Sequence, residues 1–205
     1  MSETPVGLSA SPSLLLASSS PRRRDLLQQI GVRFSVLSVD IDESRCEGEL
    51  PRDYVLRLAR EKAGAGFARQ QGALVSLGAD TIVVCDGEIF GKPRDQAHAI
   101  AMLTALSGKA HRVLSAVALV DATRAAVDVS ETAVFFRTIS PEECLTYWQT
   151  GEPLGKAGGY AVQGYGAVFV QKIEGSYSGV VGLPLAETEQ LLREFNVPLW
   201  NVVDG

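Results

Sequence analysis

Basic residues are not in excess in this chain of 205 residues: 19 Lys and Arg stand against 24 Asp and Glu, and the formal net charge is −5 at pH 7. Proteins that bind nucleic acid usually show a strong basic excess, so duplex DNA or RNA is not expected as a partner. The apolar run Leu14–Ala17 falls far below the roughly 20 residues that a membrane span needs, and residues 1–12 carry no basic targeting segment. The sequence therefore predicts neither a membrane partner nor export.

Cysteine and histidine are also scarce. The three cysteines, Cys46, Cys85 and Cys144, are odd in number and widely spaced, which fits neither a disulfide framework nor a clustered metal site. Such cysteines suit a reducing compartment, so a cytoplasmic location is expected. His98 and His111 lie in no recognisable motif with serine or cysteine, so a Ser-His-Asp triad would be a coincidence.

The composition is that of a folded protein, because hydrophobic residues make up 46% of the chain and charged residues 21%. At roughly 100–200 residues per domain, the length predicts one domain, or one domain with two lobes about a cleft. Apolar periodicity predicts strands at Leu14–Ala17, Val32–Ile41, Leu74–Val84, Glu88–Phe90, His111–Val120, Val127–Phe136 and Ala167–Ile173. Helices are predicted at Pro21–Ile30, Pro51–Gln70, from Asp95 to about Ser107, at Pro141–Gln149 and at Leu185–Phe195. Because these elements alternate irregularly, the class is α/β with a mixed sheet.

Three arginines, Arg22, Arg23 and Arg24, fall in the first turn of the helix that Pro21 begins. The N-terminal end of a helix carries a positive dipole and free N–H groups, so arginines have the wrong sign there. At about 100° per residue, Arg23 lies on the apolar stripe of this helix, Arg22 on its flank, and Arg24 points outward. An anion bound at this end, near the serines 18–20, would remove the conflict, and a solvated basic corner is the alternative.

Two charged residues interrupt apolar patterns. Lys62 falls near the middle of the apolar stripe of the second helix, where it must either extend to the surface or meet a charge. Asp80 interrupts a buried strand, where an unpaired carboxylate is costly, so a paired structural role and a catalytic role both fit. Lys92, in Gly91-Lys92-Pro93, is typical of a turn when taken alone.

Asp40, Asp42 and Glu43 form an acidic cluster at the end of the second predicted strand. Such clusters are usually solvated loops, but one or two of these carboxylates with Asp80 would suffice for Mg²⁺, which keeps waters and substrate phosphates.

The glycine-rich segment 155–164 lacks the spacing of a phosphate-binding loop or a dinucleotide fingerprint. Its Gln163 offers an acceptor and a donor that match the imide edge of a pyrimidine. A strand with bulges is the alternative interpretation of this segment.

A series of short blocks occurs in a familiar order: Ala17–Arg23, Asp42-Glu43, Ala59–Ala63, Gly78–Thr81, Gly91–Pro93, Ser107–His111, Glu152-Pro153, Lys156–Gly158, Gln163-Gly164, Ile173–Tyr177 and Val181–Leu185. In these blocks the chain resembles the Maf family of nucleoside triphosphate pyrophosphatases. The resemblance covers residues 14–195 as one domain, and it leaves residues 1–13 as a flexible N-terminal extension and residues 196–205 as a C-terminal tail.

The resemblance implies a two-lobed α/β fold in which helices flank a mixed twisted sheet with a central cleft, as in the inosine triphosphate pyrophosphatases. It implies hydrolysis of a nucleotide between the α and β phosphates, and a homodimer as the assembly. Asp80 would be the general base, and Glu43 with Asp80 would hold a divalent cation, Mg²⁺ or Mn²⁺. The phosphates would be bound by Ser18, Ser20, Arg23, Lys62 and Lys92.

Three residues bear on the substrate. Arg22, Thr81 and Gln163 are the residue types found in the branch of the family that handles dTTP and UTP, whereas the 7-methyl-GTP branch tends to have a bulky non-Arg residue, Gln and Glu. The expected reaction therefore converts dTTP, UTP and modified uridine triphosphates to the monophosphate and pyrophosphate, which limits wrong or modified nucleotides. The alternatives are a 7-methyl-GTP or broad specificity, and a non-catalytic inhibitor of septum formation that acts by binding a protein.

Overall fold

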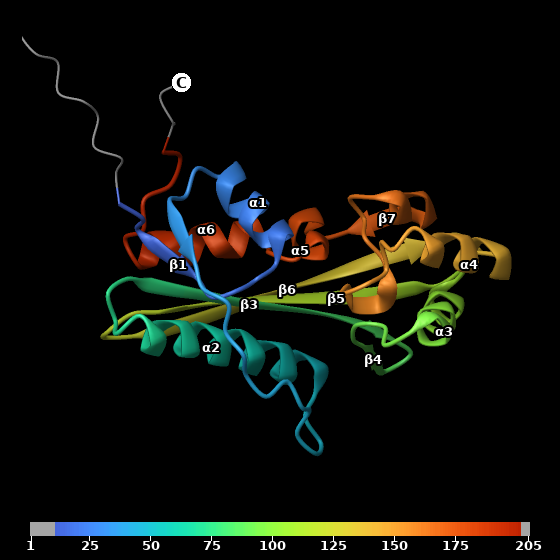
Figure 1. Cartoon of the computed structure of the whole chain (residues 1–205), viewed down its shortest axis with the longest axis horizontal. Helices are drawn as coiled ribbons and strands as arrows, with labels where there is room; N and C mark the ends of the chain where they lie inside the picture. Colours follow the sequence, from blue (N-terminus) through green and yellow to red (C-terminus); the bar gives the residue numbers. More distant parts are fainter. Residues whose placement is uncertain (1–10, 202–205) are drawn as a thin grey trace, which may run out of the picture.

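The computed structural model describes residues 11–201, and a seven-stranded sheet runs through this part of the chain (Figure 1). The strand order is β2-β1-β3-β5-β6-β7, and β4 pairs with β3 outside this path. Strand β1 lies parallel to β2 and β3, and all other pairs are antiparallel. The strands are β1 Leu14–Leu16, β2 Phe34–Val36, β3 Val75–Cys85, β4 Glu88–Phe90, β5 Ala110–Val120, β6 Ala125–Phe136 and β7 Val170–Glu174. The predicted mixed α/β class is confirmed.

Helices cover both faces of the long strands β3, β5 and β6. In Figure 1, α2 lies along one face, α1, α5 and α6 lie on the other, and α3 and α4 gather at the far end of these strands. The helices are α1 Pro21–Gln29, α2 Pro51–Arg69, α3 Gln96–Leu106, α4 Pro141–Gln149, α5 Tyr177–Val181 and α6 Leu185–Glu194, with 3₁₀ turns η1 Ala157–Gly159 and η2 Tyr165–Phe169.

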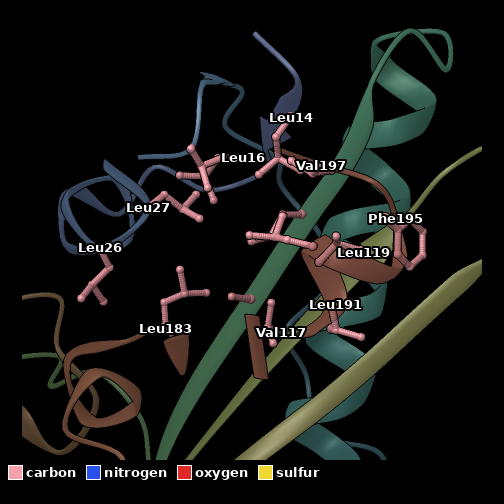
Figure 2. Close-up of a cluster of buried hydrophobic side chains, with 14 of the residues drawn as sticks. Leu14, Leu16, Leu26, Leu27, Val117, Leu119, Leu183, Leu191, Phe195 and Val197 are labelled. Carbon is pink, nitrogen blue, oxygen red and sulfur yellow. The ribbon is translucent and has the colours of Figure 1, made fainter. Parts of the chain in front are cut away.

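The apolar stripe of α1 faces a core that α6 and the sheet share (Figure 2). Leu26 and Leu27 are buried there with Leu16, while Leu191 enters from α6. Arg24 is exposed on the outer side of the helix, as its position in the turn predicts. The core therefore fixes the rotation of α1 about its axis, and with it the directions of the neighbouring arginines.

Two predicted strands differ from the structure. The strand predicted at Val32–Ile41 spans only Phe34–Val36, and an extended loop follows it to residue 50. The strand predicted at Ala167–Ile173 begins at Val170, because residues 165–169 form η2. Backbone N–H groups of Tyr165 and Gly166 donate to the Glu152 carboxylate at the start of this turn, a contact that local periodicity does not reveal.

Helix α5 was not predicted, because five residues give no helical period. The hydroxyl of Ser176 caps it by accepting a hydrogen bond from the Gly179 N–H at 3.0 Å. The predicted capping box at Ser140 and Glu143 is present, and Asp95 caps α3 as expected.

The segment after α6 packs back onto the end of α1. Val197 is buried, and the N–H groups of Trp200 and Asn201 donate to the carbonyls of Ile30 and Gly31 at 2.9 and 3.0 Å. Gly31 has φ +67°, as predicted for the end of α1, and a Cβ there would touch the backbone of Trp200. Residues 1–10 of the predicted extension and residues 202–205 of the predicted tail lie outside the described residues.

Between residues 11 and 201, none of the helices combines the length and the apolar character that a membrane crossing requires.

The backbone of helix α2 lies directly against β3 at Gly78. A Cβ at this position would overlap the backbone nitrogen of Ala63 and the carbonyl oxygen of Ala59, so only glycine allows the contact. Ala59 and Ala63 are fully buried, and Lys62 lies on the same face of α2. This contact therefore sets the distance between Lys62 and the residues that follow Gly78 on β3.

We expect Gly78→Ala to destabilise the fold by about 1–3 kcal/mol or more, because the added methyl group forces α2 away from β3. The free energy of unfolding from urea denaturation measures this loss. Gly64→Ala in the same helix is the matched control. A Cβ there meets nothing within 4 Å in residues 11–201, so this variant should gain roughly 0.5–1 kcal/mol from helix propensity. Equal stability of the two variants would contradict the packing argument.

Candidate active site

A cavity of about 480 Å³ opens between α1, α2, β3 and the glycine-rich segment. The structure brings all ten predicted site residues to its wall: Ser18, Ser20, Arg22, Arg23, Glu43, Lys62, Asp80, Thr81, Lys92 and Gln163. These residues come from six separate parts of the chain, so the fold gathers them into one cleft. Their individual roles stay predictions.

Lys62 is the centre of an ion cluster in this cleft. Its Nζ lies 2.7 Å from Asp80 Oδ1 and 2.7 Å from Glu43 Oε1. Lys62 and Asp80 are each only 9% exposed, so the lysine meets a charge instead of extending to the surface, and Asp80 is a paired carboxylate. Lys92 Nζ lies 3.9 Å from the other oxygen of Glu43.

Glu43 remains ionised in this cluster. Burial alone would raise the pKa of its carboxyl, but the hydrogen bond and charge of Lys62, followed by the charges of Lys92 and Arg23, lower that pKa below its ordinary value. Two neighbouring carboxylates therefore share one buried ammonium group.

Both half-buried arginines of α1 point into the fold. Arg23 Nε donates to the Gly182 carbonyl at 2.9 Å, and its Nη1 donates to Ser18 Oγ at 3.1 Å. Arg22 Nε donates to the Val181 carbonyl at 3.1 Å. Burial lowers the pKa of Arg23, the charge of Asp80 partly offsets this, and a guanidinium stays protonated at neutral pH in any case. The alternative of a solvated basic corner is thus wrong for these two residues.

Ser18 and Ser20 lie where the chain enters α1. Ser20 takes the N-cap position, but its side chain makes no capping hydrogen bond within the described chain. The hydroxyl oxygen of Ser18 accepts from the Ser20 N–H at 3.2 Å and from Arg23. Both hydroxyl protons therefore remain available to an acceptor in the cleft.

Thr81 follows Asp80 on β3 and contacts Arg23 through a chain of hydroxyls. Thr81 Oγ1 lies 2.6 Å from Ser115 Oγ, which donates its single proton to the Gly179 carbonyl at 2.7 Å. Thr81 therefore donates to Ser115, and its oxygen accepts from Arg23 Nη2 at 3.5 Å. The structure thus links Thr81 to the position of Arg23.

The glycine-rich segment closes the other side of the cleft and is firmly attached. The Gly158 N–H donates to the Gly91 carbonyl at 3.0 Å, and a Cβ at Gly158 would touch Val83. Glu152 accepts from the Tyr147 hydroxyl at 2.7 Å as well as from two backbone N–H groups of η2. This segment carries Gln163, which is exposed at the edge of the cavity.

Lys156 is a cleft residue that sequence reasoning did not assign a role. Its Nζ donates to the Glu152 carbonyl at 2.5 Å. Burial and then the charge of Arg22 lower the pKa of Lys156, while Glu152 raises it. Within residues 11–201, neither Lys156 nor Arg22 forms an ion pair with a carboxylate. The signal in the sequence was a lysine among glycines, which is also typical of a turn.

The charge of the cleft is opposite to that of the whole chain. Its described wall carries five cations, Arg22, Arg23, Lys62, Lys92 and Lys156, against two carboxylates, Glu43 and Asp80. The chain as a whole has a formal charge of −5. A cleft with this excess of positive charge is suited to a polyanion.

A family profile described as "Maf-like protein" matches residues 13–195. The chain belongs to the Maf family. It is 54% identical over 193 residues to a dTTP/UTP pyrophosphatase of Saccharophagus degradans, covering 93% of this chain and 92% of that protein. It is 48% identical over 193 residues to a dTTP/UTP pyrophosphatase of Photorhabdus laumondii, covering 94% and 97%.

Among solved structures, this Maf-family chain is similar to a nucleoside-triphosphatase of Mycobacterium abscessus, described as a dITP/XTP pyrophosphatase. The TM-score is 0.43 at 18% identity, over 88% of this chain and 94% of that one.

The donor set of this Maf-family cleft fits a divalent cation that brings other ligands with it. Among the described residues, no three His, Cys, Asp or Glu side chains converge as a cage. Glu43 and Asp80 nevertheless present carboxylate oxygens to one shared cation, Lys62. Mg²⁺ characteristically uses one or two carboxylates together with waters and substrate phosphates. The residues present therefore suffice for a metal that is bound together with a phosphate ligand.

We expect Glu152→Gln to loosen the glycine-rich segment, because an amide cannot replace both carboxylate oxygens as acceptors. Hydrogen bonds to a charged group contribute about 1.5–3 kcal/mol, and urea denaturation at neutral pH should show a loss of this order. Burial raises the pKa of Glu152, but the hydrogen bonds from Gly166, Tyr147 and Tyr165 lower it overall. The stability that the ionised Glu152 carboxylate contributes to the fold is therefore complete above its ordinary pKa near 4.5, and it is lost as pH falls through the lower pKa of the folded state.

The matched control is Glu88→Gln, which alters an exposed carboxylate on β4. The difference in stability between wild type and Glu152→Gln should shrink in acid, while Glu88→Gln should stay near wild type. A difference for Glu152→Gln that is constant from neutral pH into acid would show that the charge of Glu152 does not hold the segment.

Proposed function

We propose that this chain hydrolyses dTTP and UTP between the α and β phosphates and releases the nucleoside monophosphate and pyrophosphate. The observation that carries the proposal is the cleft in which a buried Lys62–Asp80–Glu43 cluster lies beside Arg23. The dTTP/UTP pyrophosphatase names of relatives about half identical to this chain support the same reaction. The proposed role is to limit wrong or modified nucleotides, modified uridine triphosphates among them.

The triphosphate would meet cations on both sides of the cleft. Arg23 is fixed by the Gly182 carbonyl and Ser18, so its guanidinium is already oriented before a ligand arrives. Lys62 and Lys92 approach from α2 and from the turn after β4, and the hydroxyls of Ser18 and Ser20 supply donors at the N-terminal end of α1. Charge-assisted hydrogen bonds of this kind stabilise charge that develops on the phosphates.

Asp80 would act as the general base. It lies on the central strand β3 at the wall of the cleft, where its carboxylate can orient a water molecule and accept its proton as the water attacks the α-phosphorus. The bond from the α-phosphorus to the bridging oxygen then breaks, and pyrophosphate leaves against the cations of the cleft. Mg²⁺ or Mn²⁺, when bound by Glu43 and Asp80 with the phosphates, would neutralise charge on the triphosphate.

The base would be read at the rim formed by α1 and the glycine-rich segment. Gln163 can donate to a ring carbonyl and accept from the N3–H of uracil or thymine. Arg22, held by the Val181 carbonyl, lies at the same rim as Lys156. Thr81 would act on specificity indirectly, because its hydroxyl contacts Arg23 and Ser115.

The location in the cell and the assembly of the chain are also proposals. A cytoplasmic location is supported by the free thiols of Cys46, Cys85 and Cys144, since none of them pairs with another within the described chain. A homodimer rests on the family resemblance alone. Residues 14–195 are proposed as the catalytic domain.

Product analysis with ¹⁸O-labelled water tests the proposed function. With dTTP and Mg²⁺, the wild type should release dTMP and pyrophosphate, and the label should appear in dTMP because the water attacks the α-phosphorus. Mass spectrometry locates the label. Label in pyrophosphate or orthophosphate would mean attack at another phosphorus, and no turnover of any nucleotide would favour the alternative of a protein-binding inhibitor.

Asp80→Asn is the variant for the same assay, because it keeps the size of the side chain and removes the proton acceptor. Loss of a general base lowers kcat by about 10²–10⁴-fold. Asp86→Asn, an exposed carboxylate at the β3–β4 turn, is the matched control and should keep its turnover. Near wild-type turnover of Asp80→Asn would show that Asp80 is structural.

Gln163→Glu tests whether the substrate is a pyrimidine nucleotide, dTTP or UTP, or 7-methyl-GTP. The change removes a donor and places a negative charge against a ring carbonyl, which should cost about 1–3 kcal/mol, or roughly 5- to 150-fold in kcat/KM for dTTP and UTP. A purine with N–H donors on its edge should lose less. Gln171→Glu on the exposed side of β7 is the control. If all nucleotides lose activity in equal proportion, Gln163 only shapes the segment.

A further inference from the structure

Lys62 holds the position between two carboxylates where a divalent cation would be expected. Its ammonium group has three N–H donors, and one points to Asp80 Oδ1 and another to Glu43 Oε1, each at 2.7 Å. Lys62 is 9% exposed, so little water reaches its ammonium group, although the Glu43 side chain is 46% exposed. The two carboxylates that would bind a metal are thus already neutralised in part by a cation of the protein itself.

We propose that Lys62 acts as a stand-in cation between Glu43 and Asp80, so that a divalent metal enters the cleft only together with the nucleotide. The proposal rests on the proposed function and names how that site takes up its metal. Mg²⁺ needs ligand oxygens at about 2.0–2.1 Å, so an ion on the same two oxygens would lie within about 4 Å of the ammonium nitrogen. The two cations therefore exclude one another at this position.

The backbone of Lys62 has no freedom to relieve this conflict. Ala59 and Ala63 of α2 lie against the backbone of β3 at Gly78, where a methyl group would not fit. Only the flexible side chain of Lys62 can move. In the absence of a ligand, the neighbouring cations Lys92 and Arg23 repel its ammonium group.

A phosphate group provides the missing acceptor. When a triphosphate lies between Arg23 and Lys92, its oxygens offer Lys62 an alternative anionic partner within the same cavity. The ammonium can then turn to the phosphate, and Glu43 and Asp80 become free for the metal that accompanies the nucleotide. The metal binding and nucleotide binding are thereby coupled through one side chain.

Binding of Mn²⁺ to the full chain, followed by the electron paramagnetic resonance signal of the free ion, tests the proposal without turnover. Without nucleotide, the wild type should bind Mn²⁺ at least tenfold more weakly than Lys62→Met, which removes the ammonium and keeps most of the stem. Lys172→Met is the matched control. It removes an exposed lysine of β7 that pairs with Glu174 outside the cleft and leaves the Lys62 contacts in place, so it should bind Mn²⁺ as weakly as wild type.

The same titration is then repeated with a non-hydrolysable α,β-imido analogue of dTTP. The wild-type protein and the analogue together should bind Mn²⁺ more tightly than the analogue does without protein. Wild type that binds Mn²⁺ without nucleotide as tightly as Lys62→Met would overturn the proposal. If the analogue does not bind at all, the proposed function fails, while the comparison of Mn²⁺ alone on wild type and Lys62→Met still decides the role of Lys62.

A measurement on the wild type covers the case in which Lys62→Met does not fold. The chain has five lysines, so the ¹⁵N ammonium signals of a lysine-labelled sample can be assigned. Mg²⁺ alone should leave the Lys62 signal unchanged, and Mg²⁺ with the imido analogue should shift it. A shift caused by Mg²⁺ alone would show that the metal displaces Lys62 without help from nucleotide.

Discussion

The contact of α2 with β3 at Gly78 is the constraint from which the cleft follows. Here two backbones meet with no side chain between them, so the helix lies as close to the sheet as chain geometry allows. Lys62 and Asp80 are then brought together from opposite sides of this contact, and the loop that carries Glu43 closes on the same ammonium group. A buried lysine, which is costly by itself, is stable here because two carboxylates surround it.

The arginine side of the cleft depends on contacts with residues 181 and 182 in the C-terminal part of the chain. Arg22 and Arg23 bond to carbonyls of Val181 and Gly182, and 159 residues separate each pair. Since α5 is itself fixed through Ser115 on the central strand β5, the direction of both guanidinium groups is set before a ligand arrives. Such preorganisation lowers the entropy cost of binding a polyanion.

The sequence indicated the site where a charge broke an apolar pattern. Lys62 in a helical stripe, Asp80 in a buried strand and arginines at a helix start each violate a local rule, and such violations are typical of functional sites. Ser115 and Lys156 could not be found in this way, because a serine in a strand and a lysine among glycines violate nothing.

The helices and strands could be predicted where a long segment has a regular apolar period of its own. Long, periodic segments such as α2 and β5 agree with the structure to within one or two residues. The errors occurred at β2, η2 and α5, where a few residues are shaped by distant partners such as the Glu152 carboxylate.

The two ends of the described chain meet at one turn. Ser13 donates to the Arg33 carbonyl, and Asn201 donates to the carbonyl of Gly31. A short linker joining these ends would leave the sheet as it is, and new ends could be opened at the exposed Asp86-Gly87 hairpin turn. We expect the cleft residues to keep their places in such a circular permutant, because the positions of the elements in the fold, and not the point at which the chain starts, bring these residues together.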